Sequence, residues 1–308
     1  MTTIWRWTRS GTDREGLGDD KRMKQRTITG LLLTALLAVL LWLPGWCMAI
    51  AVLICVSFAV HEEMQALKKA GHRLVIWPTW AAMALSVPLT YFLSQKVMVP
   101  LVGAALLAMT VQVLFRKEPK LTDLAMSALP LLTVALPGLA LVTLSLIDPY
   151  VWHMASNPQP LHAVEVIILT LTFAIPLTGD MMALFVGKAC GKRKFCPAVS
   201  PKKTMEGSLG GLAGSVLAAV IIYLMSLWMC NEATLSFLPA WWMYPLLGLA
   251  GGFAGQMGDL FASLVKRHCE LKDFSSIFPG HGGMLDRLDS VLFMAVLMYC
   301  FRLFFMTV

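Results

Sequence analysis

The feature that most constrains this chain is a series of nine apolar segments, each close to the length that crosses a lipid bilayer. A transmembrane helix needs about 20 predominantly apolar residues to cross a hydrocarbon core of roughly 30 Å. Only a helix satisfies all its backbone hydrogen bonds within a single span, so the sequence predicts an all-α polytopic membrane protein. The expected spans are 27–43, 46–62, 74–94, 97–115, 122–147, 163–187, 207–230, 241–265 and 288–307.

Composition agrees with this reading. Hydrophobic residues make up 57% of the chain and charged residues 14%, whereas a soluble domain carries about 25% charged residues. The fifth span contains Pro130 and Pro137, which predict a kink because proline cannot donate the helical hydrogen bond. We expect a polar basic tail over 1–26, a group of N-terminal membrane helices over 27–162 and a catalytic membrane region over 163–308.

The distribution of lysine and arginine predicts the orientation. If the N-terminus lies in the cytoplasm, all of the 25 basic residues except Lys96 and Arg302 fall on the cytoplasmic side of nine spans. Cytoplasmic loops of membrane proteins carry this excess of positive charge. The pattern predicts a cytoplasmic N-terminus, an external C-terminus and a location in the cytoplasmic (inner) membrane. The net charge of +7 therefore reflects topology and anionic membrane lipids, and we expect no nucleic-acid partner.

Four aspartates lie at the cytoplasmic ends of apolar spans, where a carboxylate is costly and is a candidate for function. They are Asp180, Asp259, Asp286 and Asp289. Asp259 lies near the end of its span, where the helix dipole disfavours negative charge, so a cation should compensate it. A purely structural role, in helix capping or in pairs with nearby lysine and arginine, is the alternative for each of the four.

A glycine-rich loop, Phe-Pro-Gly-His-Gly-Gly over 278–283, separates Asp259 from Asp286. Glycines allow successive backbone amides to face an anion, and neighbouring carboxylates can hold Mg²⁺ against a phosphate. Amides, carboxylates and basic side chains at one membrane depth favour phosphoryl or nucleotidyl transfer from a polyphosphate. The alternative is a glycine-rich re-entrant loop in a transporter.

The same region resembles the signature of the phosphatidate cytidylyltransferase family. The signature positions present here are Ser263, Lys266, Arg267, Lys272, Asp273, His281, Gly282, Gly283, Asp286, Arg287 and Asp289. A second block, Ser-Pro-Lys-Lys-Thr over 200–204 followed by Glu206 and Gly207, is similar to another element of the family. Asp180, followed by Gly187 and Gly191, falls where the family has an aspartate before two glycines.

The resemblance implies an enzyme that joins CTP to phosphatidate in the membrane, giving CDP-diacylglycerol and pyrophosphate for phospholipid biosynthesis, with its active site facing the cytoplasm. It implies Mg²⁺, with a second cation as an open question, held by Asp259 and Asp286. The implied catalytic residues are Lys266, Arg267, His281, Arg287 and Asp289. The implied substrate-binding residues are Asp180, Ser200, Lys202, Lys203, Ser263, Lys272, Asp273, Gly282 and Gly283.

Some positions depart from the family pattern. Met205 stands in place of a tryptophan, and Gly179, Met181 and Leu184 replace family residues around Asp180. These departures border the expected nucleotide and lipid pocket. They leave open a cytidylyltransferase for another lipid phosphate, such as an isoprenoid or ether lipid. The sequence is also compatible with a homodimer.

Overall fold

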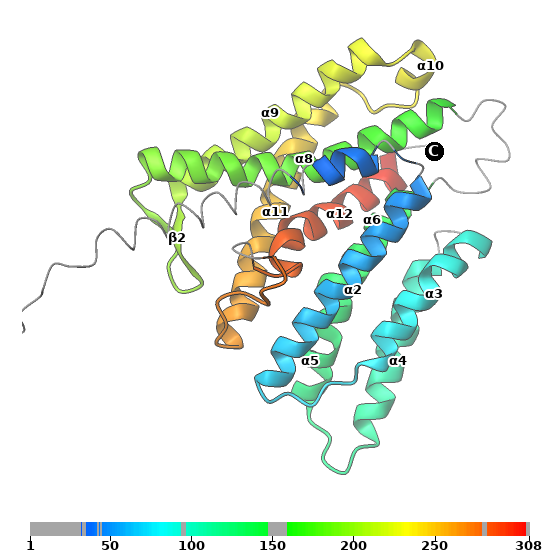
Figure 1. Ribbon diagram of the computed structural model, residues 1–308, viewed down its shortest axis with the longest axis vertical. Helices are drawn as coiled ribbons and strands as arrows, with labels where there is room; N and C mark the ends of the chain where they lie inside the picture. Colours follow the sequence, from blue (N-terminus) through cyan, green and yellow to red (C-terminus); the bar gives the residue numbers. More distant parts are fainter. Residues whose placement is uncertain are drawn as a thin grey trace, which may run out of the picture.

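The computed structural model of the protein describes residues 45–93, 97–146, 159–278 and 282–305, together with Leu32, 35–41 and Leu43. The expected basic tail and most of the first expected span lie outside these residues. The described chain is almost entirely helical, with one small β-hairpin (Figure 1). Its elements are α2 (Gly45–Lys69), α3 (Trp77–Leu93), α4 (Met98–Leu114), α5 (Leu121–Pro130), the π-helical turn η2 (Leu131–Ala135), α6 (Leu136–Leu144), α8 (Gln159–Cys190), β1 (Lys194–Cys196), β2 (Ser200–Thr204), α9 (Met205–Met229), α10 (Glu232–Leu235), α11 (Met243–His268) and α12 (Leu285–Phe305).

The expectation of an all-α membrane protein is confirmed. Among the described residues, five helical segments are long and apolar enough to cross a membrane: Gly45–Lys69, Leu121–Leu144, Ala163–Cys190, Met205–Met229 and Leu285–Phe305. Helices α3 and α4 match two further expected spans but have only 17 residues each. Helix α11 matches another but includes Gln256 and Asp259. The count of nine spans and the orientation stay predictions.

The fifth expected span is one continuous helical rod with an irregular centre. Between Pro130 and Pro137 the helix widens into η2, and the backbone N–H of Leu136 donates to the carbonyl of Leu131, five residues earlier. A proline has no N–H to donate, so the regular i to i−4 ladder is interrupted and a π turn accommodates the change.

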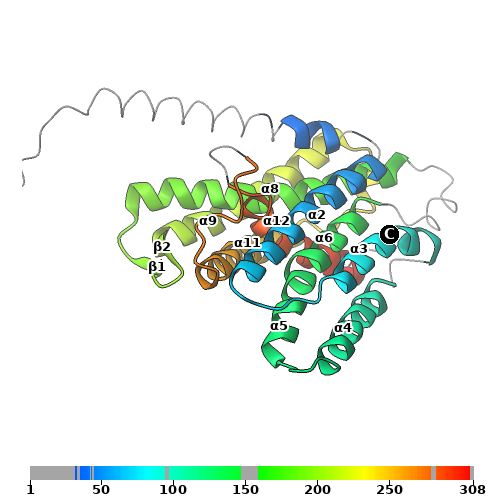
Figure 2. The same ribbon diagram turned by 60° about the horizontal axis from the view of Figure 1, so that its bottom comes forward.

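Helices α11 and α12 form the centre of the molecule. In both ribbon views they lie between the α8–α9 pair on one side and helices α2 to α6 on the other (Figures 1 and 2). Helix α12 packs against α2, α6, α8 and α11, and its side chains Leu292, Met294 and Met298 are fully buried. The two regions expected over 27–162 and 163–308 therefore share one core.

Small residues bring α9 close to α8 and α11. A side chain at Gly210 would meet Val186 of α8 at 2.6 Å, and one at Gly214 would meet Met182 at 2.5 Å. Membrane helices associate through such close van der Waals packing, because lipid provides no hydrophobic force between them. This packing fixes the position of the C-terminal half of α8, and with it Asp180.

The β-hairpin connects α8 to α9 without a flexible linker. Lys194 pairs with Thr204 and Cys196 with Ser200 in an antiparallel register. Thr204 caps α9, because its side chain accepts the N–H of Gly207 at 3.1 Å. The carboxylate of Glu206 accepts the N–H of Lys192 at 3.0 Å. These contacts fix β2, and thus the two lysines that it carries.

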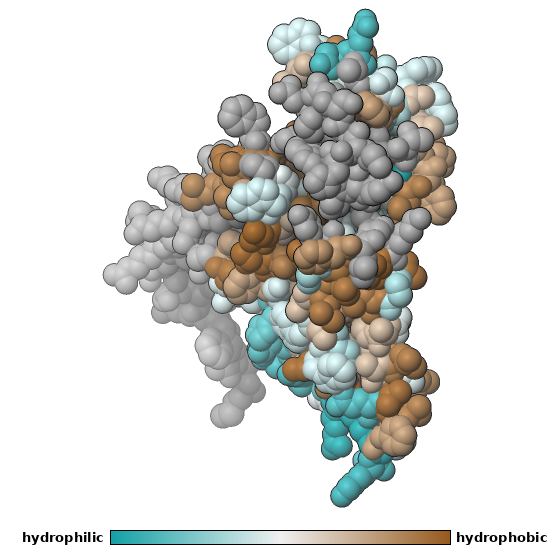
Figure 3. Space-filling model, turned by 90° about the vertical axis from the view of Figure 1, so that its right-hand side faces the viewer, coloured by the Kyte–Doolittle hydropathy of each residue, from teal (hydrophilic) through white to brown (hydrophobic). Residues whose placement is uncertain are grey.

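Apolar side chains cover much of the outer surface. Figure 3 shows brown residues over the middle of one face, with teal residues at its lower end and a smaller teal group at the top. Exposed side chains such as Leu107, Leu217 and Phe304 are large and apolar, which suits a surface that contacts lipid chains. In Figure 1 the β-hairpin lies at the left and the α4–α5 connection at the bottom, whereas α10 lies at the upper right.

Candidate active site

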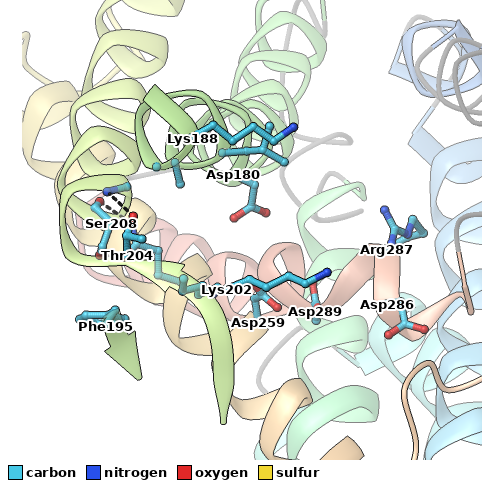
Figure 4. Close-up of a pocket in the computed structure, with 16 residues that line it drawn as sticks. Asp180, Lys188, Phe195, Lys202, Thr204, Ser208, Asp259, Asp286, Arg287 and Asp289 are labelled. Atoms are coloured by element: carbon cyan, nitrogen blue, oxygen red, sulfur yellow. Dashed lines mark hydrogen bonds and ion pairs between the residues drawn. The ribbon is translucent and has the colours of Figure 1, made fainter. Parts of the chain in front are cut away.

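A cavity of about 550 Å³ opens where α8, the β-hairpin, α9, α11 and α12 meet (Figure 4). It mixes charged side chains with the glycines of the α8–α9 contact. Its lining residues are Asp180, Ala183, Leu184, Gly187, Lys188, Phe195, Lys202, Lys203, Thr204, Gly207, Ser208, Gln256, Asp259, Asp286, Arg287 and Asp289.

Three helices each contribute a carboxylate to this cavity. Asp180 comes from α8, Asp259 from α11 and Asp289 from α12. Figure 4 shows Asp180 pointing toward the side of the cavity where Asp259 and Asp289 lie. The hydroxyl of Ser290 donates to Asp180 at 3.0 Å, and the backbone N–H of Ser290 lies 2.8 Å from Asp289. Ser290 therefore ties the carboxylates of α8 and α12 together.

Basic side chains surround the same space. The ammonium of Lys203 lies 2.5 Å from the carboxylate of Asp259, which provides the positive partner expected near the end of α11. Lys188, Lys202 and Arg287 also line the cavity, and within the described part of the chain none of the three forms an ion pair. These three cations are available to an anionic ligand.

Asp286 has a different environment from the other three aspartates. Its carboxylate accepts the ammonium of Lys266 at 2.6 Å and the backbone N–H groups of Phe274 and Gly283 at 3.0 and 2.9 Å. Only 4% of its side chain is exposed, and Figure 4 shows it pointing away from Asp259 and Asp289. Asp286 therefore holds the loop between α11 and α12 through Oδ2, while its Oδ1 binds Lys266 of α11. Gly282, at φ 83°, gives that loop a turn that side chains rarely adopt.

The structure divides the expected site residues into two groups. Asp180, Lys202, Lys203, Asp259, Asp286, Arg287 and Asp289 line the cavity. Ser200, Ser263, Lys266, Arg267, Lys272, Asp273, Gly282 and Gly283 do not, and His281 lies outside the described residues.

Several members of the second group have specific places near the cavity. Lys266 is bound to Asp286 and lies 5.5 Å from the ring centre of Phe274. The guanidinium Nε of Arg267 approaches the carbonyl of Val199, in the turn of the hairpin, at 3.4 Å. Lys272 and Asp273 are exposed on the α11–α12 loop.

The polar cavity residues that sequence reasoning missed include Gln256 and Ser208. The amide nitrogen of Gln256 donates to the carbonyl of Ser208 at 2.9 Å, and its amide oxygen accepts the Ser208 hydroxyl. This pair joins α11 to the start of α9 next to the carboxylates. The available signal was a polar amide one helical turn before Asp259 within an otherwise apolar span, because such residues are costly in lipid.

The carboxylates were tested for their fit to a metal ion. Over the described ranges, no three acidic, histidine or cysteine side chains are placed closely enough to hold one. Asp180, Asp259 and Asp289 nevertheless supply the hard oxygen donors that Mg²⁺ prefers, and they face a common cavity. The donor chemistry fits Mg²⁺ provided that Lys203 releases Asp259, whereas the oxygens of Asp286 are already engaged.

Comparison with known proteins gives a consistent result. The model of the cytidylyltransferase family matches residues 24–305. A phosphatidate cytidylyltransferase of Synechocystis is 31% identical over 295 residues, which cover 90% of this chain and 95% of the relative.

Other relatives match only part of the chain. A phosphatidate cytidylyltransferase of Bacillus subtilis is 44% identical over 121 residues, which cover 39% of this chain and 41% of the relative. The uncharacterized protein YnbB of Escherichia coli is 38% identical over 135 residues, covering 43% and 42%. The matched regions thus span less than half of the Bacillus and Escherichia relatives.

The family model covers both the membrane helices and the charged cavity, including the loop that Asp286 organises. This chain belongs to the cytidylyltransferase family.

Proposed function

We propose that the protein transfers a cytidylyl group from CTP to phosphatidate, producing CDP-diacylglycerol and pyrophosphate. The observation that carries the proposal is the cavity in which four carboxylates and four basic side chains meet at one end of a membrane bundle. Among the described residues, three of those basic side chains form no ion pair, so they suit a polyphosphate. A purely structural ion pair between Lys203 and Asp259 would not require these three additional cations. The Bacillus and Synechocystis relatives are named phosphatidate cytidylyltransferases, which supports the same reaction.

A second cavity supports the use of a lipid as the other substrate. It measures about 400 Å³ and shares Asp180, Leu184, Asp286, Arg287 and Asp289 with the first. Its other lining residues include Leu177, Met181 and Phe185, which are exposed apolar side chains of α8. A lipid phosphate entering past this apolar edge would meet Arg287, while its acyl chains stayed among nonpolar side chains.

The residues of the cavity account for the chemical step mainly through electrostatics and positioning. An oxygen of the lipid phosphate attacks the α-phosphorus of CTP, the bond from that phosphorus to the bridging oxygen breaks, and pyrophosphate leaves with the electron pair. The attacking oxygen is already anionic, so no strong general base is needed. Lys202, Lys203 and Arg287 would neutralise the two anions as they approach and stabilise charge on the leaving group.

The proposal includes Mg²⁺. When bound, it would shield the CTP phosphates and favour departure of pyrophosphate. Asp259 is the expected ligand from α11, and Asp289 and Asp180 face the same cavity. The sequence prediction also assigned Asp286 to the metal, and this assignment requires Asp286 to release Lys266 or a backbone N–H.

The proposed location is the cytoplasmic membrane, with nine spans and the cavity facing the cytoplasm. Support comes from the basic residues of the hairpin and of the α11–α12 loop, which lie at one end of the bundle (Figure 1). CTP is a soluble nucleotide, so this placement gives it direct access to Lys202 and Lys203.

A reconstituted assay tests the proposal. Purified protein in vesicles should convert labelled CTP, Mg²⁺ and phosphatidate to a labelled lipid and release pyrophosphate in equal amount. The Lys202→Ala/Lys203→Ala double variant is the control for contaminating activity. If no lipid phosphate becomes labelled while the protein retains its fold, the proposed reaction is wrong.

The same assay distinguishes the second candidate, another lipid phosphate. Met181 and Leu184, two departures from the family pattern, line the apolar second cavity. They lie where the lipid body is expected, so they bear on the choice of lipid rather than on the transfer chemistry. Preferred turnover of an isoprenoid or ether-lipid phosphate over phosphatidate would establish this alternative.

A further inference from the structure

Glu62 is a buried carboxylate of α2 that contacts the loop before α12. Only 4% of Glu62 is exposed, although it lies on a helix far from the signature in sequence. Its Oε1 accepts the hydroxyl of Ser275 at 2.5 Å and the N–H of Met284 at 3.0 Å, and its Oε2 accepts the N–H of Leu285 at 2.8 Å. The two carboxylate oxygens of Glu62 therefore accept three hydrogen bonds, all from the α11–α12 loop and the start of α12.

We propose that Glu62 is a positioning residue that fixes the α11–α12 loop, and through it the register of Asp286, Arg287 and Asp289 in the cavity. The inference rests on the cytidylyl transfer proposed above. Glu62 lines neither cavity, so it does not act on substrate directly. Its role is to hold the backbone from which the cavity residues project.

The need for this carboxylate follows from the start of α12. The first backbone N–H groups of a helix have no partner within the helix. Met284 and Leu285 would otherwise leave two such groups in the protein interior, where an unmade hydrogen bond is costly. A carboxylate also interacts favourably with the positive end of the helix dipole. Glu62 therefore satisfies the backbone and orients α12.

Asp286, in the first turn of α12, holds the same loop through other backbone groups. Glu62 binds Met284 and Leu285, while Asp286 binds the N–H groups of Phe274 and Gly283. A side chain at Gly283 would meet the Glu62 carboxylate at 2.6 Å. The absence of a side chain at Gly283 thus lets Glu62 approach the loop. Two carboxylates, one from α2 and one from α12, together define its path.

The adjacent residue provides a matched control. Glu63 is also buried, at 1% exposure, but its hydrogen-bond partner is the hydroxyl of Thr133 at 3.1 Å, in η2. Glu63→Gln retains a group that can accept this bond and removes no hydrogen bond to the α11–α12 loop. Glu62→Gln keeps one acceptor oxygen but replaces the other with an NH₂ group. That group is a donor, so it cannot accept the hydrogen bond that the second oxygen accepted. Comparing the two variants separates the loop contact from the loss of a buried carboxylate on α2.

Cys269 offers a local reporter that needs no turnover. It is a free, buried thiol directly after α11, at the start of the loop. With the other six cysteines replaced, the rate of alkylation by a maleimide measures how often the loop opens. The alkylation rate of Cys269 does not depend on whether the protein catalyses the proposed reaction, so it tests the loop contact separately. Glu63→Gln again serves as control, because it replaces a nearby carboxyl group without removing a hydrogen bond to the loop.

The expected order of effects follows the number of bonds lost. Ser275→Ala removes one donor and should lower kcat less than about fivefold. Glu62→Gln should lower it about tenfold, and Glu62→Ala, which leaves both N–H groups unpaired, about 100-fold or more. The KM for CTP should stay within about threefold in each variant, because the cavity lysines are unchanged. Cys269 should be alkylated about tenfold faster in Glu62→Ala than in Glu63→Gln.

Two results would overturn the inference. One is a kcat for Glu62→Ala within about threefold of wild type. The other is Cys269 alkylation in Glu62→Ala at the rate of Glu63→Gln. If Glu62→Ala is not recovered from membranes, the Glu62→Gln and Glu63→Gln pair decides the matter, and equal kcat and equal alkylation in that pair would reject the role.

Discussion

The ammonium of Lys203 lies 2.5 Å from the carboxylate of Asp259, and this contact joins the β-hairpin to the C-terminal part of α11. Both side chains are between a quarter and a third exposed. An ion pair with this exposure contributes about 1 kcal/mol or less to stability. The contact therefore matters less for folding than for the charge of the cavity, where Lys203 balances one carboxylate until an anionic substrate arrives.

The first prediction concerns this lysine. Lys203→Ala should lower kcat/KM for CTP about 100-fold, because a cation facing the transferred phosphate is lost, while the melting temperature in detergent changes little. Lys194→Ala is the matched control, since Lys194 lies on the same hairpin, is exposed and does not line the cavity. Steady-state kinetics of both variants measure the effect. If the two variants have the same kcat/KM for CTP, Lys203 does not take part in the reaction.

The second prediction concerns the metal requirement. Chelation of divalent ions should abolish turnover, and Mg²⁺ should restore it. Asp259→Asn keeps the size of the side chain but removes the charge that a hard cation prefers. We expect this variant to need about tenfold more Mg²⁺ for half-maximal activity, measured by Mg²⁺ titration at fixed CTP.

Asp286→Asn serves as the contrast in that titration. The carboxylate of Asp286 binds Lys266 and two backbone N–H groups. Its loss should lower kcat at every Mg²⁺ concentration without moving the midpoint. If the Mg²⁺ midpoint shifts for Asp286→Asn and not for Asp259→Asn, then Asp286 and not Asp259 is the metal ligand.

The third prediction concerns topology. With the native cysteines replaced, a cysteine at exposed Lys272 should react with a membrane-impermeant maleimide only from the cytoplasmic side. A cysteine at exposed Glu232, in α10, should react only from the external side. Asn157, which lies outside the described residues, is expected to behave like Glu232. Labelling of positions 272 and 232 from the same side would contradict the nine-span arrangement.

The fourth prediction concerns helix packing. A methyl group at Gly248 would lie 2.6 Å from the Cα of Val216 and 2.8 Å from the carbonyl oxygen of Ser215, so α11 would have to move away from α9. Gly248→Ala should lower the melting temperature by several degrees, because overpacking costs about 1–3 kcal/mol. Gly103→Ala is the control, since nothing lies within 4 Å of the added group. It should be neutral or slightly stabilising, as alanine favours the helix over glycine.

The sequence by itself determined the helices and the polar end of the bundle. Apolar runs reflect burial or contact with lipid, so their lengths predicted α2, α8, α9 and α12 with small errors at the ends. Costly carboxylates at span ends marked Asp180, Asp259 and Asp289, and all three line the cavity. The local pattern of proline likewise marked the irregular part of the fifth span, where η2 lies.

Only the tertiary structure decided which of these groups touch. Asp259 and Asp286 looked equivalent in the sequence, yet Asp259 pairs with Lys203 in the cavity and Asp286 is bound to the loop that precedes it. Glu62 gave no functional signal as one charged residue near the end of an apolar helix. Its partner Ser275 lies 213 positions away in the chain. Helical periodicity specifies the face on which a residue lies, but the contact between two helices depends on how all their side chains pack together.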